Sequence, residues 1–296
     1  MENPRVRRAI GPPGFQSRRT LSVGLLLGKA LRRGFKWRRE AGISRAMRPP
    51  IRPRAALSLL LAVALELAAL PAAHAAGAQD RDRNRAEPLA EAQHRAWRAI
   101  GRVNVAGFDT GGFCTGTLIA PDRVLTAAHC LYALRGSARA QPGQVHFLAG
   151  WYKGTYAAHR IARAVLSNPD FHPGKKPDFR SLRSDVALLV LETPITDIPP
   201  LPVATPDLVG PSVTVIGYRR DRLNALTKVT DCRVVVQNPG MVGLGCPVVQ
   251  GTSGAPVLQR EGSRWSVVGV VSASVSGAGE IHSVAARPSA AFLAGR

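Results

Sequence analysis

Short apolar runs, divided by Gly, Pro, Asn and Asp, occupy the chain from residue 100 onward. The runs are four to ten residues long and rich in Val, Ile and Leu, and no long amphipathic helical pattern intervenes. This pattern favours short β-strands and predicts an all-β sandwich or barrel. The Pro- and Asp-rich stretch 193–211 should connect two halves, and a helical turn is expected at 289–293. The expected strands are 113–120, 123–128, 144–149, 159–166, 185–191, 212–218, 226–236, 254–259, 265–274 and 281–286.

The N-terminal part of the chain has a different pattern. Residues 47–54 are basic, residues 55–70 form an apolar run, and Ala73-His74-Ala75 has the form of a signal cleavage site. The alternative is a membrane-spanning helix. However, the run is about 16 residues long and contains Glu66, whereas a span needs about 20 apolar residues. We therefore expect residues 47–75 to be a signal peptide, cut after Ala75 or, alternatively, one residue later.

The segments on either side of this signal are polar. Residues 1–46 are rich in Arg, Gly and Pro and show no sustained periodicity. We expect translation to start at Met47, with residues 1–46 a basic extension that comes from a misplaced start. The alternative is a disordered basic extension of the protein. Residues 76–98 should form a linker or a short pro-segment, and residues 99–296 the folded domain.

The basic charge is unevenly distributed. The formal net charge is +21, but residues 1–54 contain 15 Lys and Arg against 2 Asp and Glu, whereas residues 76–296 contain 25 against 16. A strongly basic domain would suggest nucleic acid as a partner. Most of the excess lies outside the domain, which has no basic patch with interleaved aromatic residues. We therefore expect no nucleic-acid partner.

The chain contains four cysteines, Cys114, Cys130, Cys232 and Cys246. An even number in an exported chain predicts two disulfides, although three pairings are open. No two cysteines have Cys-x-x-Cys spacing, so a metal site is less favoured than disulfides.

Three segments hold a histidine, an aspartate and a serine in that order. They read Leu-Thr-Ala-Ala-His-Cys at 125–130, Ser-Asp-Val-Ala-Leu-Leu-Val-Leu at 184–191 and Gly-Thr-Ser-Gly-Ala-Pro at 251–256. A serine hydroxyl becomes a strong nucleophile when a histidine takes its proton and a buried carboxylate holds that histidine. The nucleophile elbow of α/β-hydrolases does not fit, because Ala255 replaces its last glycine and alternating helices are missing.

These segments resemble those of the trypsin/chymotrypsin-like serine peptidases, and are most similar to bacterial exported trypsin-like and glutamyl-endopeptidase-like members. The resemblance implies two packed antiparallel β-barrels, about 100–195 and 210–287, with the active site in the cleft between them. It also implies the disulfides Cys114–Cys130 and Cys232–Cys246.

The resemblance assigns a role to each residue of the three segments. His129 would be the general base, Asp185 the acid that orients it, and Ser253 the nucleophile. The backbone N–H groups of Gly251 and Ser253 would form the oxyanion hole. Thr252 stands where zymogen-activated trypsins have an aspartate, so activation through that ion pair is not expected.

The resemblance also assigns the walls of the pocket for the side chain just before the cleaved bond. Pro247 stands where trypsins have an aspartate, and Val271 where glutamyl endopeptidases have a histidine. A buried unpaired charge is costly, so the pocket should favour small or medium apolar side chains. The alternative is that Glu280 reaches in from a neighbouring turn. The assigned walls, none of which is charged, are Pro247, Val248, Val249, Gln250, Val271, Ser272, Ala273 and Ser274.

The sequence thus predicts a secreted or periplasmic serine endopeptidase that acts on proteins or peptides. It should need no metal or other cofactor and keep no membrane span after signal removal. Two other functions stay open. One is a catalytically silent peptidase homologue used for binding, against which the intact His129, Asp185 and Ser253 count. The other is a basic module that binds nucleic acid or the cell envelope.

Overall fold

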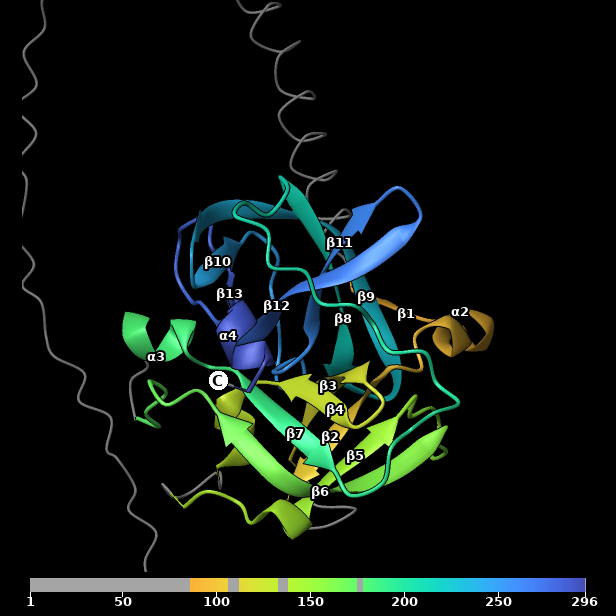
Figure 1. Cartoon of the computed structure of the whole chain (residues 1–296). Coiled ribbons are helices and arrows are strands. Elements are labelled where there is room, and N and C mark those ends of the chain that lie inside the picture. The colour runs from red at the N-terminus through yellow and green to blue at the C-terminus, as the bar shows by residue number, and fades with distance from the viewer. Residues whose placement is uncertain (1–85, 106–111, 133–137, 175–177, 296) are drawn as a thin grey trace, which may run out of the picture. The chain divides into compact units, whose positions relative to one another are not determined.

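The computed structural model describes residues 86–105, 112–132, 138–174 and 178–295. The expected extension 1–46 and signal peptide 47–75 lie outside these residues. Within the described ranges, no helix combines the length and the apolar character that crossing a membrane requires. Figure 1 shows the described part as two groups of strands, β2–β7 and β8–β13.

Most strands coincide with the expected ranges to within a few residues. The first half contains β1 (Glu87–Pro88), α2 (Glu91–Ala96), β2 (Ile100–Val105), β3 (Phe113–Ala120), β4 (Arg123–Thr126), the 3₁₀ turns η1 (Ala128–Leu131) and η2 (Pro142–Gln144), β5 (Val145–Ala149), β6 (Ala158–Ser167), α3 (Phe179–Arg183) and β7 (Ala187–Leu191). The second half contains β8 (Ser212–Arg219), β9 (Arg222–Asn238), β10 (Met241–Leu244), β11 (Pro256–Glu261), β12 (Arg264–Ser274), β13 (Ser283–Ala286) and α4 (Ala290–Leu293).

Strands β2–β7 form the first barrel, a closed antiparallel ring in the order β2-β3-β4-β7-β6-β5. Side chains of a strand point alternately inward and outward, and on β5 Val145, Phe147 and Ala149 are fully buried in the barrel core. Gly101 of β2 leaves space for this core, because a Cβ there would lie 2.5 Å from Phe147 Cε2. The ring therefore closes around tightly packed apolar side chains.

Strands β8–β13 form the second barrel. Its order is β9-β10-β13-β12-β11-β8, and the pairing of β8 with β9 closes the ring, while β1 adds to β9 from outside. Val213, Val257 and Val271 are buried in its core, next to the Cys232–Cys246 disulfide, whose Cα atoms are 5.3 Å apart. The prediction of an all-β fold with two antiparallel barrels is therefore confirmed.

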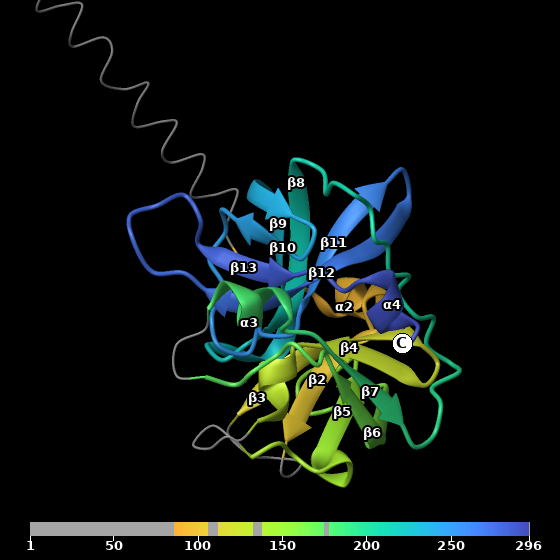
Figure 2. The ribbon, with the colours of Figure 1, turned by 60° about the vertical axis from the view of Figure 1, so that its left-hand side comes forward.

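A further group of buried side chains belongs to both barrels. It includes Leu125 of β4 and Leu188 of β7 from the first barrel, and Ile216 and Tyr218 of β8 from the second. Figure 2 shows the two barrels stacked one above the other. The shared apolar core holds them against each other, so side chains from different barrels can contribute to one site.

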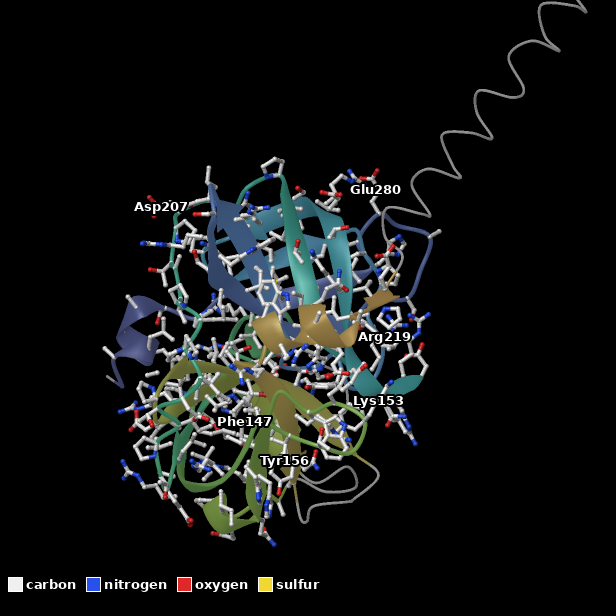
Figure 3. All side chains as sticks on the ribbon, turned by 90° about the vertical axis from the view of Figure 1, so that its right-hand side faces the viewer. Phe147, Lys153, Tyr156, Asp207, Arg219 and Glu280 are labelled. Carbon is white, nitrogen blue, oxygen red and sulfur yellow. A yellow bond between two sulfur atoms is a disulfide. The ribbon has the colours of Figure 1, made fainter. Side chains whose placement is uncertain are left out.

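Residues 86–98, part of the segment 76–98 that the sequence predicted to be a linker or a short pro-segment, pack on the domain. β1 pairs with β9, and the buried Leu89 donates its N–H to Leu226 O at 2.9 Å. On α2, the ring of His94 lies 4.9 Å from the ring of Tyr152 in the first barrel. Figure 3 shows this segment lying across the junction of the barrels. The ordered domain thus begins before its first barrel strand.

The burial of His94 should make stability depend on pH. His94 is 3% exposed, and burial lowers the pKa of its imidazole from 6.5 to about 4. The unfolded chain therefore binds a proton between these pH values that the folded chain does not. Consequently, the free energy of unfolding should decrease as the pH falls from 6.5 to 4. Each pKa unit corresponds to about 1.4 kcal/mol, so His94 should contribute a loss of about 3 kcal/mol.

Chemical denaturation at several pH values, in a Ser253→Ala background that prevents self-cleavage, would measure this loss. His94→Phe should flatten the pH dependence between 6.5 and 4, because the new side chain cannot titrate. His172→Gln, at an exposed histidine, is the matched control and should keep the slope of the parent. An unchanged slope in His94→Phe would contradict the prediction.

Candidate active site

His129 lies at the edge of the first barrel, just after β4. β4 ends at Thr126, and the chain turns into η1, where Ala128 and Leu131 are fully buried while the His129 side chain is 38% exposed. Cys130 ties η1 to β3 through its disulfide with Cys114, with Cα atoms 6.1 Å apart. The imidazole is therefore presented at the surface by a firmly anchored turn.

Asp185 lies directly before β7 and is 3% exposed. Its Oδ2 atom is 2.6 Å from His129 Nδ1, and its Oδ1 accepts the His129 backbone N–H at 2.8 Å. Ser272 of β12 donates its hydroxyl to the same Oδ2 at 2.5 Å. A buried carboxylate is costly unless hydrogen-bonded, and these three bonds satisfy it. The bond from Ser272 also connects the second barrel to the first.

This contact raises the pKa of His129. Burial of the ring favours its neutral form, but the charge of Asp185 and the hydrogen bond to it outweigh burial and hold the pKa of His129 above 6.5. Because Asp185 accepts from Nδ1, the neutral ring carries its proton there. Nε2 is then left as the basic nitrogen of the ring.

Ser253 lies in the turn before β11, and this turn is packed against the first barrel. The Ser253 carbonyl accepts the Thr115 N–H of β3 at 2.8 Å, and the Gly254 N–H donates to Val271 O of β12 at 2.8 Å. Gly254 has φ of +80°, and a Cβ there would overlap Thr115 O and Thr126 Oγ1. Only glycine allows such a close approach with this backbone conformation.

The structure thus brings His129, Asp185 and Ser253 to one region where the barrels meet. His129 and Asp185 contact directly, whereas Ser253 is joined to them through β3 and β12. Among the described residues, Ser253 Oγ makes no hydrogen bond to His129 Nε2, which lies 3.8 Å from Cys130 Sγ. In unliganded sites such bonds are often long and tighten when substrate binds.

The turn before Ser253 also presents backbone donors. Gly251 has φ of +93°, and its carbonyl is fixed by the Thr115 hydroxyl at 2.8 Å. Within the described part of the chain, the N–H groups of Gly251 and Ser253 donate no hydrogen bond. Two backbone donors of this kind can bind a negatively charged oxygen.

The side chains near His129 do not form a metal centre. In the described ranges, the one group with the spacing of metal ligands is Cys114, His129 and Cys130. Its two sulfur atoms are bonded to each other, so neither is the thiolate that would bind a metal. Both disulfides have the pairing that the resemblance implied.

The assigned pocket walls flank the Ser253 turn on two sides. In the segment before the turn, Pro247 and Gln250 are exposed while Val248 and Val249 are half-buried. On β12, burial decreases from Val271 and Ser272 through Ala273 to the exposed Ser274. The Ser272 hydroxyl is bonded to Asp185, so this residue orients the carboxylate in addition to lying in the wall segment.

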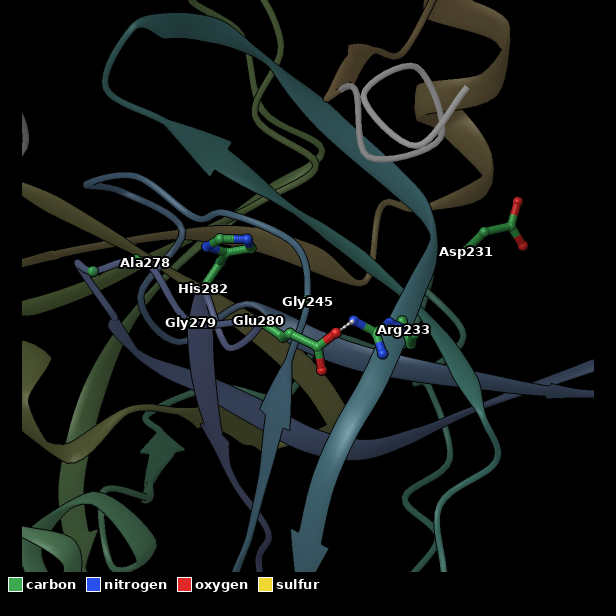
Figure 4. A pocket seen from close by; sticks show the side chains of 8 residues that line it. Asp231, Arg233, Gly245, Ala278, Gly279, Glu280 and His282 are labelled. Carbon is green, nitrogen blue, oxygen red and sulfur yellow. Dashed lines mark ion pairs between the residues drawn. The ribbon is translucent and has the colours of Figure 1, made fainter. Parts of the chain in front are cut away.

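Glu280 lies at a separate pocket. Figure 4 shows its carboxylate directed at Arg233 of β9, and Oε1 lies 3.2 Å from Nη2. Glu280 therefore has a partner of opposite charge outside the assigned walls. The pocket has a volume of about 380 Å³ and is lined by Asp231, Arg233, Gly245, Gly277, Ala278, Gly279, Glu280 and His282.

Thr115 organises the Ser253 turn, although its local sequence did not identify it as a site residue. Thr115 is fully buried. Its N–H binds Ser253 O, its hydroxyl binds Gly251 O, and its carbonyl accepts the Thr126 hydroxyl. A threonine inside a predicted strand usually signals only β-propensity, and the partners of Thr115 are far away in the sequence. Its position beside Cys114 was the one local signal.

The comparisons with known proteins agree with this architecture. Residues 114–270, more than half of the chain, match the family model described as a trypsin-like peptidase domain. The chain belongs to the trypsin-like peptidase family, as the three motifs predicted, and is a serine peptidase.

Two solved structures share the fold. One is a Glu endopeptidase in complex with MPD, with a TM-score of 0.56 and 20% identity over 71% of this chain and 93% of that chain. The other is the protease Anisep from Arthrobacter nicotinovorans, with a TM-score of 0.50 and 19% identity over 64% of this chain and 89% of that chain.

Proposed function

We propose that the protein is an exported endopeptidase that cleaves peptide bonds through an acyl-enzyme on Ser253. The observation that carries this proposal is the arrangement of Asp185, which holds both the ring and the backbone of His129 beside the Ser253 turn. A silent homologue would have no use for a buried carboxylate bonded to a half-buried histidine, because burying that charge is costly.

The reaction would proceed in two steps. Ser253 Oγ attacks the carbonyl carbon of the substrate, and its proton passes to His129 Nε2. The oxygen of the tetrahedral intermediate is stabilised by the N–H groups of Gly251 and Ser253. The C–N bond breaks as His129 gives the proton to the leaving amine, which leaves an ester on Ser253. A water molecule, deprotonated by His129, then hydrolyses the ester and regenerates Ser253.

Labelling with a fluorophosphonate probe tests this proposal directly, because the probe reacts with an activated serine. Residues 76–296 of the chain should be labelled at Ser253, and Ser253→Ala should not be labelled. The matched control is Ser263→Ala, at an exposed serine of the turn between β11 and β12, which should label like the parent. An unlabelled parent that is folded would favour the silent homologue instead.

The pH dependence of the activity should follow His129. A general base must be neutral, so kcat/KM should fall as the pH decreases through the pKa of His129, with a midpoint above 6.5. Asp185→Asn removes the charge that raises this pKa, so the midpoint should move to lower pH. The rate should also fall by about 10⁴, because the ring loses its tautomer and orientation. A pH–rate profile of both proteins measures the shift, and an unmoved midpoint would contradict the role of Asp185.

The pocket before the cleaved bond should accept small or medium apolar side chains. The assigned walls carry no charge, and Glu280 is paired with Arg233. Fluorogenic peptides that vary only at this position should show Val, Ala and Leu preferred over Arg, Lys and Glu. A preference for Arg or Lys of more than tenfold, about 1.4 kcal/mol in transition-state binding, would contradict the assignment and make Glu280 the first residue to mutate.

Export is the remaining element of the proposal. The signal pattern of residues 47–75 and the two disulfides support a secreted or periplasmic location. The packing of residues 86–98 supports a mature chain that keeps them. Intact-mass measurement of the exported protein tests both points, and a mature chain that still contained residues 48–54 would contradict the signal.

A further inference from the structure

The Ser253 turn has two flanks of different character. On one flank lies β12, which accepts the Gly254 N–H and bonds Asp185 through Ser272. Of the uncharged walls assigned to the side chain before the cleaved bond, Val271–Ser274 belong to this flank, whereas Pro247–Gln250 lead into the turn on its other side. On the other flank, the Cα of Gly251 faces Phe113 and Arg220, and a Cβ there would lie 2.6 Å from Phe113 Cε2 and 3.1 Å from Arg220 N.

This second flank carries positively charged side chains, one of which lies over an aromatic ring. The guanidinium of Arg102 lies 4.1 Å from the centre of the Phe113 ring. Arg220 is exposed and donates from Nη1 to Gln250 Oε1 at 2.7 Å, while its N–H bonds Gln250 O at 2.8 Å. We call Arg102, Phe113, Arg220 and Gln250 the basic shelf. None of its members is acidic.

The charge of Arg220 has no carboxylate partner among the described residues. The nearest acid in sequence, Asp221, is bonded by two hydrogen bonds to Arg219 instead. The hydrogen bonds from Arg219, and to a lesser extent its charge, lower the pKa of Asp221 against the opposing effect of burial. Arg220 thus offers a guanidinium whose present acceptor is a neutral amide oxygen. A carboxylate would be a stronger acceptor, since Arg binds carboxylates through two parallel N–H donors.

The shelf and the wall segment of β12 lie on different sides of the Ser253 turn. If the part of a peptide before the cleaved bond lies along this wall segment, the part after the bond leads away from β12, toward the Gly251 side. One extended residue spans about 3.3 Å, so the first two residues after the cleaved bond extend about 7 Å from Ser253. Their side chains then come within reach of a guanidinium anchored beside Gly251.

We propose that the basic shelf binds the residues that follow the cleaved bond and selects substrates with Asp or Glu at the first or second of them. This inference rests on the proposed peptidase function and specifies its substrate class. The preference comes from Arg220, whose guanidinium donates to the neutral amide oxygen of Gln250. For an exposed ion pair the expected gain in kcat/KM is about fivefold.

The test uses quenched fluorescent peptides that are identical up to the cleaved bond and carry Glu, Gln or Lys at the two positions after it. The parent protein should cleave the Glu peptide about fivefold faster than the Gln peptide in kcat/KM, and the Lys peptide most slowly. Added salt should reduce the Glu/Gln ratio, because it screens exposed charges.

Arg220→Gln should bring the Glu/Gln ratio close to one. Arg222→Gln is the matched control. It removes the same charge from the same β8–β9 hairpin, but its side chain binds Ala86 O instead, so it should keep the ratio of the parent. A parent that cleaves Glu and Gln peptides equally, or an Arg220→Gln variant that keeps the preference, would overturn the proposal. Failure to cleave any peptide together with failure to label with a fluorophosphonate would instead overturn the proposed function.

Discussion

Replacing Ser253 or His129 by alanine is expected to lower kcat by about 10⁴–10⁶. The reason is that the nucleophile and the base act as one unit, so removal of either leaves only binding and the backbone donors of the Ser253 turn. The double variant should therefore be little worse than either single variant. Steady-state kinetics on one good peptide substrate, with active-site titration of the parent, measures these losses.

Two controls make this prediction specific. His172→Gln and Ser263→Ala change an exposed histidine and an exposed serine, and both should keep the activity of the parent. Losses that add in the double variant would contradict a shared mechanism. Unchanged activity of Ser253→Ala would contradict the assignment of the nucleophile altogether.

Gly254→Ala is expected to cost more than any other glycine substitution near the site. The new Cβ would overlap Thr115 O and Thr126 Oγ1, which are hydrogen-bonded to each other and cannot easily move apart. Gly254 also has φ of +80°, which alanine rarely adopts. The Ser253 turn would have to move away from the first barrel. A displacement of about 1 Å in an active site can reduce the rate by about 10²-fold, and overpacking adds about 1–3 kcal/mol of destabilisation.

Gly262→Ala separates the steric effect from the conformational one. Gly262 also has positive φ, +59°, but nothing lies within 4 Å of its Cβ position. The Gly262→Ala variant should therefore lose about 1 kcal/mol of stability from backbone strain alone and keep the activity of the parent. Thermal unfolding and kcat/KM of both variants test the difference, and equal effects at the two glycines would show that the contact with the first barrel is unimportant.

The all-β fold was predictable from the sequence because most of its strands are apolar segments bounded by turn residues. β3 matches its expected range, and β8 and β12 differ from theirs by one residue. β10 escaped prediction because Met241–Leu244 is short and lies between two glycines, Gly240 and Gly245. Its identity as a strand depends on pairing with β9 and β13, which a local pattern does not contain.

The N-terminal segment was harder to predict for a related reason. Residues 76–98 are polar overall, and composition favoured a linker. In the structure, Leu89 and His94 are nevertheless buried, because the barrels provide an apolar surface at their junction. A few side chains therefore determine that the segment packs on the domain, and the average polarity of the segment does not reveal them.

For the candidate site, the motifs pointed to His129, Asp185 and Ser253 because each stands in a distinctive local context, and the fold brings the three residues to one region. The motifs did not reveal that Ser272 bonds Asp185 or that Thr115 bonds the Ser253 turn. Serine and threonine are common in strands for many reasons. Their partners lie 87 and 136 residues away in the chain, so only the folded arrangement distinguishes these two from other hydroxyl side chains.

The site is divided between two separately closed barrels, so its geometry and the expected activity depend on how the barrels dock. His129 and Asp185 belong to the first barrel, whereas Ser253 and Ser272 belong to the second. A small rotation of one barrel against the other would leave every strand pairing and both disulfides intact, yet would separate the base from the nucleophile. Under the proposed mechanism, neither half alone would cleave a peptide bond. A chain whose barrels had not yet docked would therefore not digest itself.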